Sequence, residues 1–544
     1  MKTFPPSPAS TLLPTRSNAC GPAPDRETAP GHRPARLPTP VQNGWTGVGV
    51  TFPLLALLVL LAPAPGSAAG YSGTVTALQS VVEREMQQWG VAGIAVALVD
   101  DQKTIHAGGF GEAGKDSIFR VGSISKLFNA IAVMQQVEQG HLDLDAPLPG
   151  DVLPVNPFPG APSPTLRQLL CHRSGLQRES AVGGYLDGSN PGLSATVASL
   201  RNGVLATRPN EKTRYSNIGA SLAGYLVARV SGEDYVTYQQ RHLLDPLGMK
   251  SSGWLHAAMP GDRLIRAHMR VADGRGGWTR KVAPVFDLGT IPAGNLFASA
   301  EDLARFASAL IARDPKLAKP ATLEQMWTPQ LTGDHRGFGL GFLVDRFREH
   351  RSVSHSGAVF GHSTSLVVLP EARIAVVVLG NEDICNGPIR TISDAALSLM
   401  LEAKLGEAPP AAPGPLTLPA DDLGDFAGDS ESGSYWAAIR VEQGKLTGEM
   451  AGQPLVLARE GPLSFTAHSR IHTAAALQFK RETGGGRVVE FTLAGQTFGR
   501  APAEAAPLPP AWEKYLGSYG PDFIPLVVSE RHGHLYVMTE NMVD

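Results

Sequence analysis

The 544-residue chain has few cysteines, no strong charge imbalance and none of the common signatures of metal or nucleotide sites. Its three cysteines, Cys20, Cys171 and Cys385, lie far apart without CxxC spacing, which argues against a zinc site or a disulfide framework. We expect Cys171 and Cys385 to be buried free thiols, with a single pair between them as the alternative. A formal net charge of −3 gives no electrostatic attraction to DNA, RNA or anionic lipid, so no nucleic-acid partner is expected.

Short motifs for other chemistries are also missing. His350, His355 and His362 lack HExxH spacing, so a catalytic metal is disfavoured. Neither GxGxxG nor a P-loop occurs at a strand-to-helix junction, and no GxSxG elbow supplies an α/β-hydrolase nucleophile. The sequence therefore predicts a site without metal or cofactor, acting on a small-molecule or peptide substrate; it leaves the oligomeric state open.

The N-terminal part indicates export. Residues 1–47 are rich in Pro, Ser and Thr and are typical of a disordered or untranslated leader. Within the signal-peptide-like residues 48–69, the apolar run Leu54 to Ala62 is well short of the ~20 residues that a spanning helix needs, and small residues follow it. We expect cleavage near Ala69, no stable membrane span afterwards, and a periplasmic or secreted protein. A membrane anchor formed by the uncleaved segment is the alternative.

Residues 70–405 predict one large α/β domain. A hairpin is expected over Gly93–Gly111 with its turn at Asp100–Gln102, and adjacent strands over 352–381. Strands at both ends with helices between them imply a sheet whose edges come from distant parts of the chain. Helices are predicted at Val75–Gln88, Lys126–Gln139, Ile218–Val230, Glu301–Ala312 and Ile389–Leu405.

The C-terminal part has a different pattern. Residues 406–418 are a Pro/Ala linker, and the alternating strands of residues 419–502 predict a small antiparallel β domain. In residues 503–544, Tyr515-Leu516-Gly517 and Gly533 repeat the pattern of Phe426-Ala427-Gly428 and Gly444, with the same sixteen-residue interval between glycines. This incomplete second β repeat either stops short or completes the first sheet. A packing or gating role is expected for the C-terminal region.

The stretch "FRVGSISKLFNAIAVMQ" places Ser123 three residues before Lys126 at the start of a predicted helix. Residues at this spacing lie on one helix face, so Ser123 could be a nucleophile with Lys126 as its base. The alternative is that Ser123 or Ser125 only caps the helix. Ser125, adjacent to Lys126, projects from another face and is expected to give local support.

Two more sets of residues follow in order. Tyr215 and Asn217 form Tyr-x-Asn before a predicted amphipathic helix, and His355-Ser356-Gly357 lie on a predicted strand. With "WGVAGIAVALVDD", "TLRQLLCHRSGL", "HLLDPLGM" and "AGNLFASAEDLARF", these motifs make the chain resemble the penicillin-recognising serine hydrolases: class C β-lactamases, D-alanyl-D-alanine carboxypeptidases, D-aminopeptidases and related esterases.

The resemblance implies a serine β-lactamase/DD-peptidase-like domain with an antiparallel sheet and a helical subdomain, followed by a small, lipocalin-like antiparallel β domain. Ser123 would be the acyl-accepting nucleophile, Lys126 its proton partner and Tyr215 the acid/base. Asn217 would bind the substrate amide or Lys126. His355, Ser356, Gly357 and Ala358 would bind substrate, with the backbone N–H groups of Ser123 and Ala358 as the oxyanion hole.

Proton transfer constrains these roles. Lysine and tyrosine both titrate near ~10 when unperturbed, so neither is a competent base at neutral pH unless burial or a neighbouring cation lowers its pKa. Lys126 close to Tyr215 supplies such a coupling, and the sequence does not say which of the two carries the proton. The lactamases of the family usually have lysine at the position of His355. A histidine with a pKa near ~6.5 is mostly neutral at pH 7 and favours a peptidase or esterase, with turnover of carboxylate-bearing substrates expected to fall between pH 5.5 and 8.

The sequence thus predicts an exported serine hydrolase that acts through an acyl-enzyme on an ester or a D-amino-acid amide or peptide. A β-lactamase is one alternative, and a non-catalytic binder or sensor of penicillin or wall peptides is another. His172, in "LLCHRSGL", is expected to be structural rather than catalytic.

Overall fold

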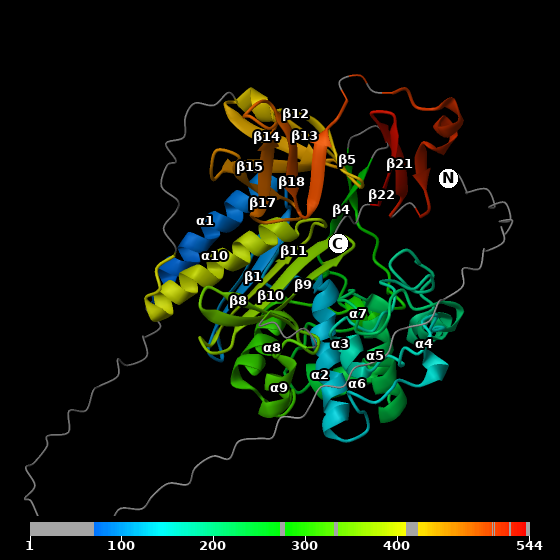
Figure 1. Ribbon diagram of the computed structural model, residues 1–544. Helices are drawn as coiled ribbons and strands as arrows, with labels where there is room; N and C mark the ends of the chain where they lie inside the picture. The colour runs from blue at the N-terminus through cyan, green and yellow to red at the C-terminus, as the bar shows by residue number, and fades with distance from the viewer. Residues whose placement is uncertain are drawn as a thin grey trace, which may run out of the picture. The chain divides into compact units, whose positions relative to one another are not determined.

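The computed structural model describes residues 70–272, 278–330, 336–409, 423–502, 504, 506–521 and 524–539 (Figure 1). The leader, the signal-like segment, Cys20 and most of the linker lie outside these residues. Among the helices of the described ranges, none is long and apolar enough to cross a membrane. Cys171 and Cys385 are both free and buried, as expected.

A seven-stranded antiparallel sheet forms the centre of the domain, in the order β2-β1-β11-β10-β9-β8-β7. The N-terminal hairpin β1–β2 pairs through β1 with β11, so the sheet joins segments that are distant in sequence, as predicted. The strands are β1 (Gly93–Asp100), β2 (Lys103–Gly111), β7 (Gly337–Phe338), β8 (Leu343–Phe347), β9 (His350–Val359), β10 (His362–Leu369) and β11 (Ile374–Gly380).

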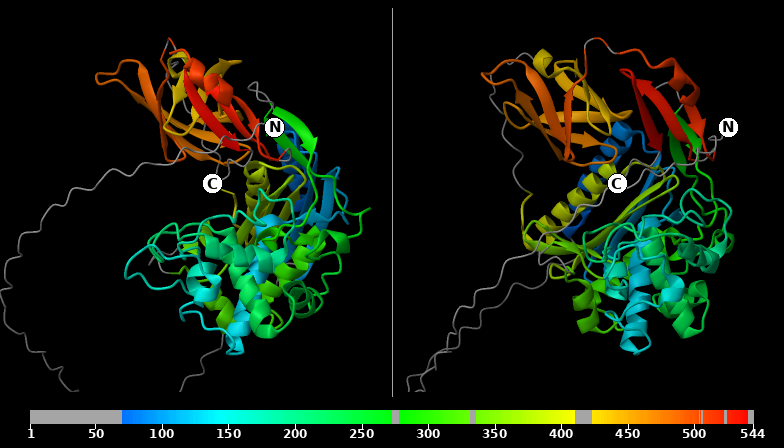
Figure 2. Two further views of the ribbon diagram at one scale, coloured as in Figure 1. Left: turned by 90° about the vertical axis from the view of Figure 1, so that its right-hand side faces the viewer. Right: turned by 45° about the vertical axis from the view of Figure 1, so that its right-hand side comes forward.

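Helices cover both faces of this sheet, which explains why its central strands are continuously apolar. Along β1, Ile94 and Val96 join the core beneath α1 (Ser72–Trp89) and α10 (Asn386–Leu405), because alternate residues of a strand face opposite sides. Ala95 and Ala97 join the core on the other side, beneath α8 (Ala300–Ala312). Figures 1 and 2 show α1 and α10 side by side along the sheet.

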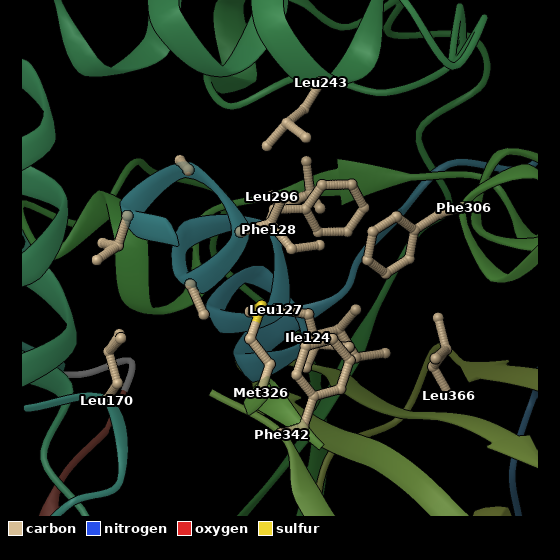
Figure 3. Packing of buried hydrophobic residues seen from close by; sticks show 14 of the residues in the cluster. Ile124, Leu127, Phe128, Leu170, Leu243, Leu296, Phe306, Met326, Phe342 and Leu366 are labelled. Carbon is tan, nitrogen blue, oxygen red and sulfur yellow. The ribbon is translucent and has the colours of Figure 1, made fainter. Parts of the chain in front are cut away.

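Helix α2 (Ser125–Glu138) is the centre of the helical subdomain. Buried residues lie all around it, including Leu127, Phe128 and Ile131, and Phe128 stacks on Phe306 at 4.1 Å between ring centroids (Figure 3). A helix that is buried on every side holds its first turn rigidly. The other helices here are α3 (Leu166–Leu170), α4 (Gly192–Ala198), α5 (Asn217–Ser231), α6 (Tyr235–Gln239), α7 (Ile291–Gly294) and α9 (Pro320–Met326).

The five predicted helices are all present, and the structure extends most of them by one to three residues at an end. The largest differences at a helix start are three residues: α1 begins at Ser72 instead of Val75, and α10 begins at Asn386 instead of Ile389. Gly387 and Pro388 lie in its first turn, where proline is tolerated because the first N–H groups of a helix have no intrahelical acceptor.

The antiparallel β domain is a closed eight-stranded barrel. Pairing of β12 with β19 closes it, and aromatic side chains fill its interior, with Phe491 stacked on Phe498 at 4.9 Å between ring centroids. Its strands are β12 (Gly428–Glu431), β13 (Trp436–Glu442), β14 (Lys445–Met450), β15 (Gln453–Arg459), β16 (Ser464–Ser469), β17 (Ala475–Arg481), β18 (Val488–Leu493) and β19 (Gln496–Arg500).

The C-terminal repeat is visible in the backbone. A 3-10 turn precedes both β12 and β20 (Gly517–Tyr519), and their first glycines have similar φ angles, +140° for Gly428 and +134° for Gly517. The second copy continues with β21 (Leu526–Arg531) and β22 (His534–Thr539). The alternative that this copy completes the first sheet is wrong: β20, β21 and β22 form a separate sheet, because the barrel already closes on itself.

Two side chains from the C-terminal region are buried against the α/β domain. Arg470, only 1% exposed, donates to the carbonyl oxygens of Trp89 and Asp383 and lies 3.6 Å from a Glu382 carboxylate oxygen. Ile524 belongs to an apolar cluster that includes Val359 at the end of β9. The C-terminal region therefore packs close to the strand that borders the candidate site.

Candidate active site

Ser123 lies in a 3-10 turn, Gly122–Ile124, that leads directly into α2. The capping alternative is wrong, because neither Ser123 nor Ser125 caps α2: Ile124 is the cap residue and makes no side-chain cap bond. Ser125 is fully buried, donates to the Gly122 carbonyl oxygen at 2.6 Å and accepts from the Leu296 N–H at 3.1 Å. It supports the turn, as expected, while Ser123 keeps partial exposure.

Two glycines bring this turn against β9. Gly122 has φ +54°, and a Cβ there would lie 2.8 Å from the Ala358 nitrogen. A Cβ on Gly357 would lie 2.1 Å from the carbonyl oxygen of Val121, which Thr364 also contacts through a 2.9 Å hydrogen bond. Only glycine permits this backbone contact. It places the Ala358 backbone beside the turn that carries Ser123.

Lys126 is 3% exposed and points its ammonium group at the Ser123 hydroxyl. Its Nζ donates to Ser123 Oγ at 2.9 Å and to the Ala293 carbonyl oxygen of α7 at 2.6 Å. The pKa of Lys126 is lowered to about 7, mainly by burial; the charge of Glu179 opposes the shift and the charge of Arg178 adds to it. Near neutral pH, a large fraction of Lys126 is therefore an uncharged amine.

Tyr215, the residue before the α5 cap Ser216, contacts the same pair. Its side chain hydrogen-bonds Ser123, and the Lys126 Nζ lies 4.8 Å from its ring centroid. Burial raises the pKa of Tyr215 above its ordinary value. Since Tyr215 holds its proton while Lys126 loses one near neutrality, the structure favours Lys126 as the group that becomes the base.

His355 lies on β9 as predicted, and its ring faces Tyr215 at 6.2 Å between centroids. The expectation that it titrates near ~6.5 is wrong, because burial, with the nearby Lys126, lowers its pKa to about 4. Its Nδ1 lies 2.6 Å from the Ser356 carbonyl oxygen. A carbonyl only accepts, so Nδ1 carries the proton and Nε2 is an acceptor.

Asn217 is the first residue of α5, and its amide donates to a Glu179 carboxylate oxygen. The sequence pattern predicted Lys126 or the substrate amide as its partner, whereas the structure shows a carboxylate there. Glu179 and Arg178 were missed by sequence reasoning. They follow "LLCHRSGL" in a loop, and no periodic pattern marks which loop residues turn toward the nucleophile.

His172 packs against Ser216 and Tyr215. Its Nδ1 accepts from the Ser216 backbone N–H at 3.2 Å, and its ring lies 4.3 Å from the Tyr215 ring. This confirms its structural role.

His350 lies elsewhere and pairs with Glu407, with 3.0 Å between its Nε2 and a carboxylate oxygen; this pair does not have the spacing of a metal-binding motif. Over the described ranges, no group of three or more His, Cys, Asp or Glu could hold a metal ion.

The arrangement suits nucleophilic catalysis. A hydroxyl is a weak nucleophile until a neighbouring base removes its proton. Here the buried Lys126, whose pKa is lowered, lies within hydrogen-bond distance of the Ser123 hydroxyl. Fold and cluster together define a serine hydrolase of the penicillin-recognising type.

Comparison with known proteins gives the family. A family model described as Beta-lactamase matches residues 78–396, which is more than half of the chain, so the protein belongs to the beta-lactamase family. The resemblance drawn from Ser123, Lys126, Tyr215, Asn217 and His355 is thereby confirmed at the level of the family.

Relatives and solved structures agree with this assignment. The chain is 26% identical to "Putative beta-lactamase-like 1" of Homo sapiens over 61% of its own length and 71% of that protein. It is 25% identical to "Unguisins hydrolase ungD'" of Aspergillus campestris over 60% of this chain and 65% of that one. It also resembles the D-amino acid amidase of Ochrobactrum anthropi, with 26% identity and a TM-score of 0.52 over 61% of this chain and all of that one.

A further solved structure shows the same fold. The octameric penicillin-binding protein homologue of Pyrococcus abyssi has a TM-score of 0.56 and 23% identity, covering 78% of this chain and 99% of that one.

The pKa of Lys126 predicts the pH dependence of the reaction. If Lys126 must be neutral to accept the Ser123 proton, kcat/KM for a neutral ester rises with pH through a midpoint near 7 and then levels off. His355→Gln should lower the rate but keep this midpoint, because His355 titrates near 4, below the window. A midpoint above pH 9, or one that disappears in His355→Gln, would contradict the assignment.

Proposed function

We propose that the protein is a serine hydrolase that acts through an acyl-enzyme on an ester or on a D-amino-acid amide or peptide. The observation that carries this proposal is the 2.9 Å contact between the Nζ of the buried Lys126 and Ser123 Oγ. The likeness to a D-amino acid amidase supports the amide or peptide substrate.

The first step is acylation of Ser123. Its Oγ attacks the substrate carbonyl carbon while the neutral Lys126 takes the hydroxyl proton. The new bond converts the carbonyl oxygen into an oxyanion, which the backbone N–H groups of Ser123 and Ala358 stabilise. Each such donor contributes about 3 kcal/mol in enzymes that use them.

The second step releases the leaving group and then the acid. Tyr215 protonates the departing alcohol or amine, and the proton held by Lys126 restores Tyr215 through their contact at Ser123. A water molecule then attacks the acyl-enzyme, gives its proton to the same pair and regenerates Ser123. The two groups thus share the proton transfers: Lys126 accepts the Ser123 proton and Tyr215 protonates the leaving group.

The remaining candidate residues bind the substrate. His355, Ser356, Gly357 and Ala358 follow one another along β9, beyond Ser354, where the pairing of β9 with β8 ends, and this part of the strand can pair with an extended acyl group. His355 is neutral above its pKa of about 4 and supplies no fixed cation, so efficient capture of a β-lactam carboxylate is not expected. A pure sensor needs no base, and the lowered pKa of Lys126 therefore favours an enzyme over a binder.

Covalent labelling tests the nucleophile. A fluorescent fluorophosphonate should label the wild-type protein and not Ser123→Ala, and p-nitrophenol release from a short ester should fall by at least 1000-fold in that variant. Ser434→Ala is the matched control, since it makes the same chemical change at an exposed serine outside the site. Labelling that survives Ser123→Ala would refute the assignment, and stable labelling by a penicillin without ester turnover would favour the sensor.

We also propose that the protein is exported. The apolar run Leu54–Ala62 and the small residues before Gly70 support this, although they lie outside the described residues. N-terminal sequencing of the protein recovered from its host should give a start near Ala69. A start at Met1 in a membrane fraction would instead support an uncleaved anchor.

A further inference from the structure

The first turn of α10 receives its cap from the barrel. Cys385, the residue at the cap position, makes no side-chain hydrogen bond to the helix. Instead the Gly387 N–H donates to the carbonyl oxygen of Arg470 at 2.8 Å, and the Thr473 hydroxyl donates to the Gly387 carbonyl oxygen at 2.7 Å. Because the first N–H groups of a helix have no acceptor within it, the connection between β16 and β17, residues 469–474, supplies a partner that α10 lacks.

This contact is made at backbone distance. A Cβ on Gly387 would lie 2.1 Å from the Ser469 carbonyl oxygen and 3.2 Å from the carbonyl carbon of Arg470, so the helix has no room for a side chain there. The side chain of Arg470 is buried as well and donates to the carbonyl oxygens of Trp89 and Asp383. Backbone and side-chain contacts therefore fix the barrel against the start of α10.

The same turn of α10 reaches the active-site strand through Asn386. Its Nδ2 donates to the carbonyl oxygen of Gly357 on β9 at 3.2 Å. That carbonyl and the Ala358 N–H belong to one planar peptide unit, so a bond that orients the carbonyl also orients the N–H. Donation to the carbonyl polarises the unit and strengthens the N–H as a donor. The Ala358 N–H is one of the two groups assigned above to the oxyanion hole.

Strand β9 has one strand partner at this position. Its pairing with β8 ends at Ser354, whereas β10 continues beside it, with Thr364 opposite Gly357 and Ser363 opposite Ala358. An edge that receives substrate cannot also be occupied by a further strand. Asn386 adds a hydrogen bond to β9 where β8 no longer pairs with it.

We propose that the barrel positions the oxyanion hole through Asn386, which orients the Gly357–Ala358 peptide while the β16–β17 connection fixes the turn that carries it. This inference rests on the proposed acyl-enzyme chemistry and adds a role for the barrel in that chemistry. Asn386 and Gly387 are positioning residues, because they act through the peptide of β9 and not on the reacting atoms.

An oxygen ester and its thiono analogue isolate the contribution of the oxyanion hole. The two substrates are p-nitrophenyl acetate and O-p-nitrophenyl thionoacetate, in which sulfur, a weak hydrogen-bond acceptor, replaces the carbonyl oxygen. Loss of one oxyanion-hole donor costs about 100-fold or more in kcat, so misorientation of one should cost about tenfold on the oxygen ester and less than about threefold on the thiono ester. The ratio of the two kcat/KM values does not depend on the fraction of active protein.

Two variants break the chain of contacts at different points. Asn386→Ala removes the bond to Gly357, and Gly387→Ala introduces a methyl group against the barrel, although alanine is the better helix former. Both should lower the ratio of kcat/KM for the oxygen and thiono esters. Gly73→Ala, in α1 with no atom within 4 Å of the added Cβ, and Asn202→Ala, at an exposed asparagine, are the matched controls and should keep the wild-type ratio.

Other results overturn the inference. Equal losses for the two esters in both variants would mean that these residues serve only the fold. A lowered ratio in Asn386→Ala with the wild-type ratio in Gly387→Ala would mean that the barrel has no part in positioning. A displaced pH midpoint would place the effect on Lys126 instead of the oxyanion hole. Turnover that survives Ser123→Ala would refute the proposed function itself, which is a distinct outcome.

A milder variant decides the matter if Gly387→Ala does not fold. Thr473→Val keeps the shape of the side chain and removes only the hydroxyl that donates to Gly387. It should lower the ratio for the two esters in the same direction by a smaller factor. Thr497→Val makes the same change at an exposed threonine of the barrel and should leave the ratio unchanged. An identical ratio in the wild-type protein and Thr473→Val would then overturn the inference.

Discussion

The catalytic site depends on burying the Lys126 amine against the Ser123 hydroxyl. In water a lysine is charged at neutral pH and cannot accept a proton. Burial of Lys126 removes that water and lowers its pKa to about 7. The cost falls on stability. The unfolded chain holds the proton more tightly, so this residue destabilises the fold fully below about pH 7. The cost declines as the pH rises from 7 to the pKa of the unfolded chain, and stability therefore rises with pH across that window.

The rest of the fold keeps that contact fixed. The first turn of helix α2 is buried, and Gly122 and Gly357 let β9 approach the turn at backbone distance. The sheet that carries β9 is anchored by β1 and β11, and Arg470 and Ile524 add contacts from the C-terminal region. A small site is thus positioned by elements from most of the chain.

Much of this could be predicted from the sequence where local pattern decides structure. Alternating or periodic apolar residues located the helices, the β1–β2 hairpin and the barrel strands, and the order of Ser123, Lys126, Tyr215 and His355 indicated the family. Loop placement and desolvation could not be predicted. Glu179 turns toward Lys126 from a loop without periodicity, and the pKa of His355 falls to about 4 because of burial that no local motif encodes.

The most direct test is the titration of Lys126 itself. Protein labelled with 13C and 15N lysine, with the Lys126 signal assigned by its loss in Lys126→Met, can be followed by NMR from pH 5 to 11. The account predicts a midpoint near 7 for this one lysine. A midpoint near ~10.4, the value of an unperturbed lysine, would show that Lys126 stays charged and would contradict its role as the base.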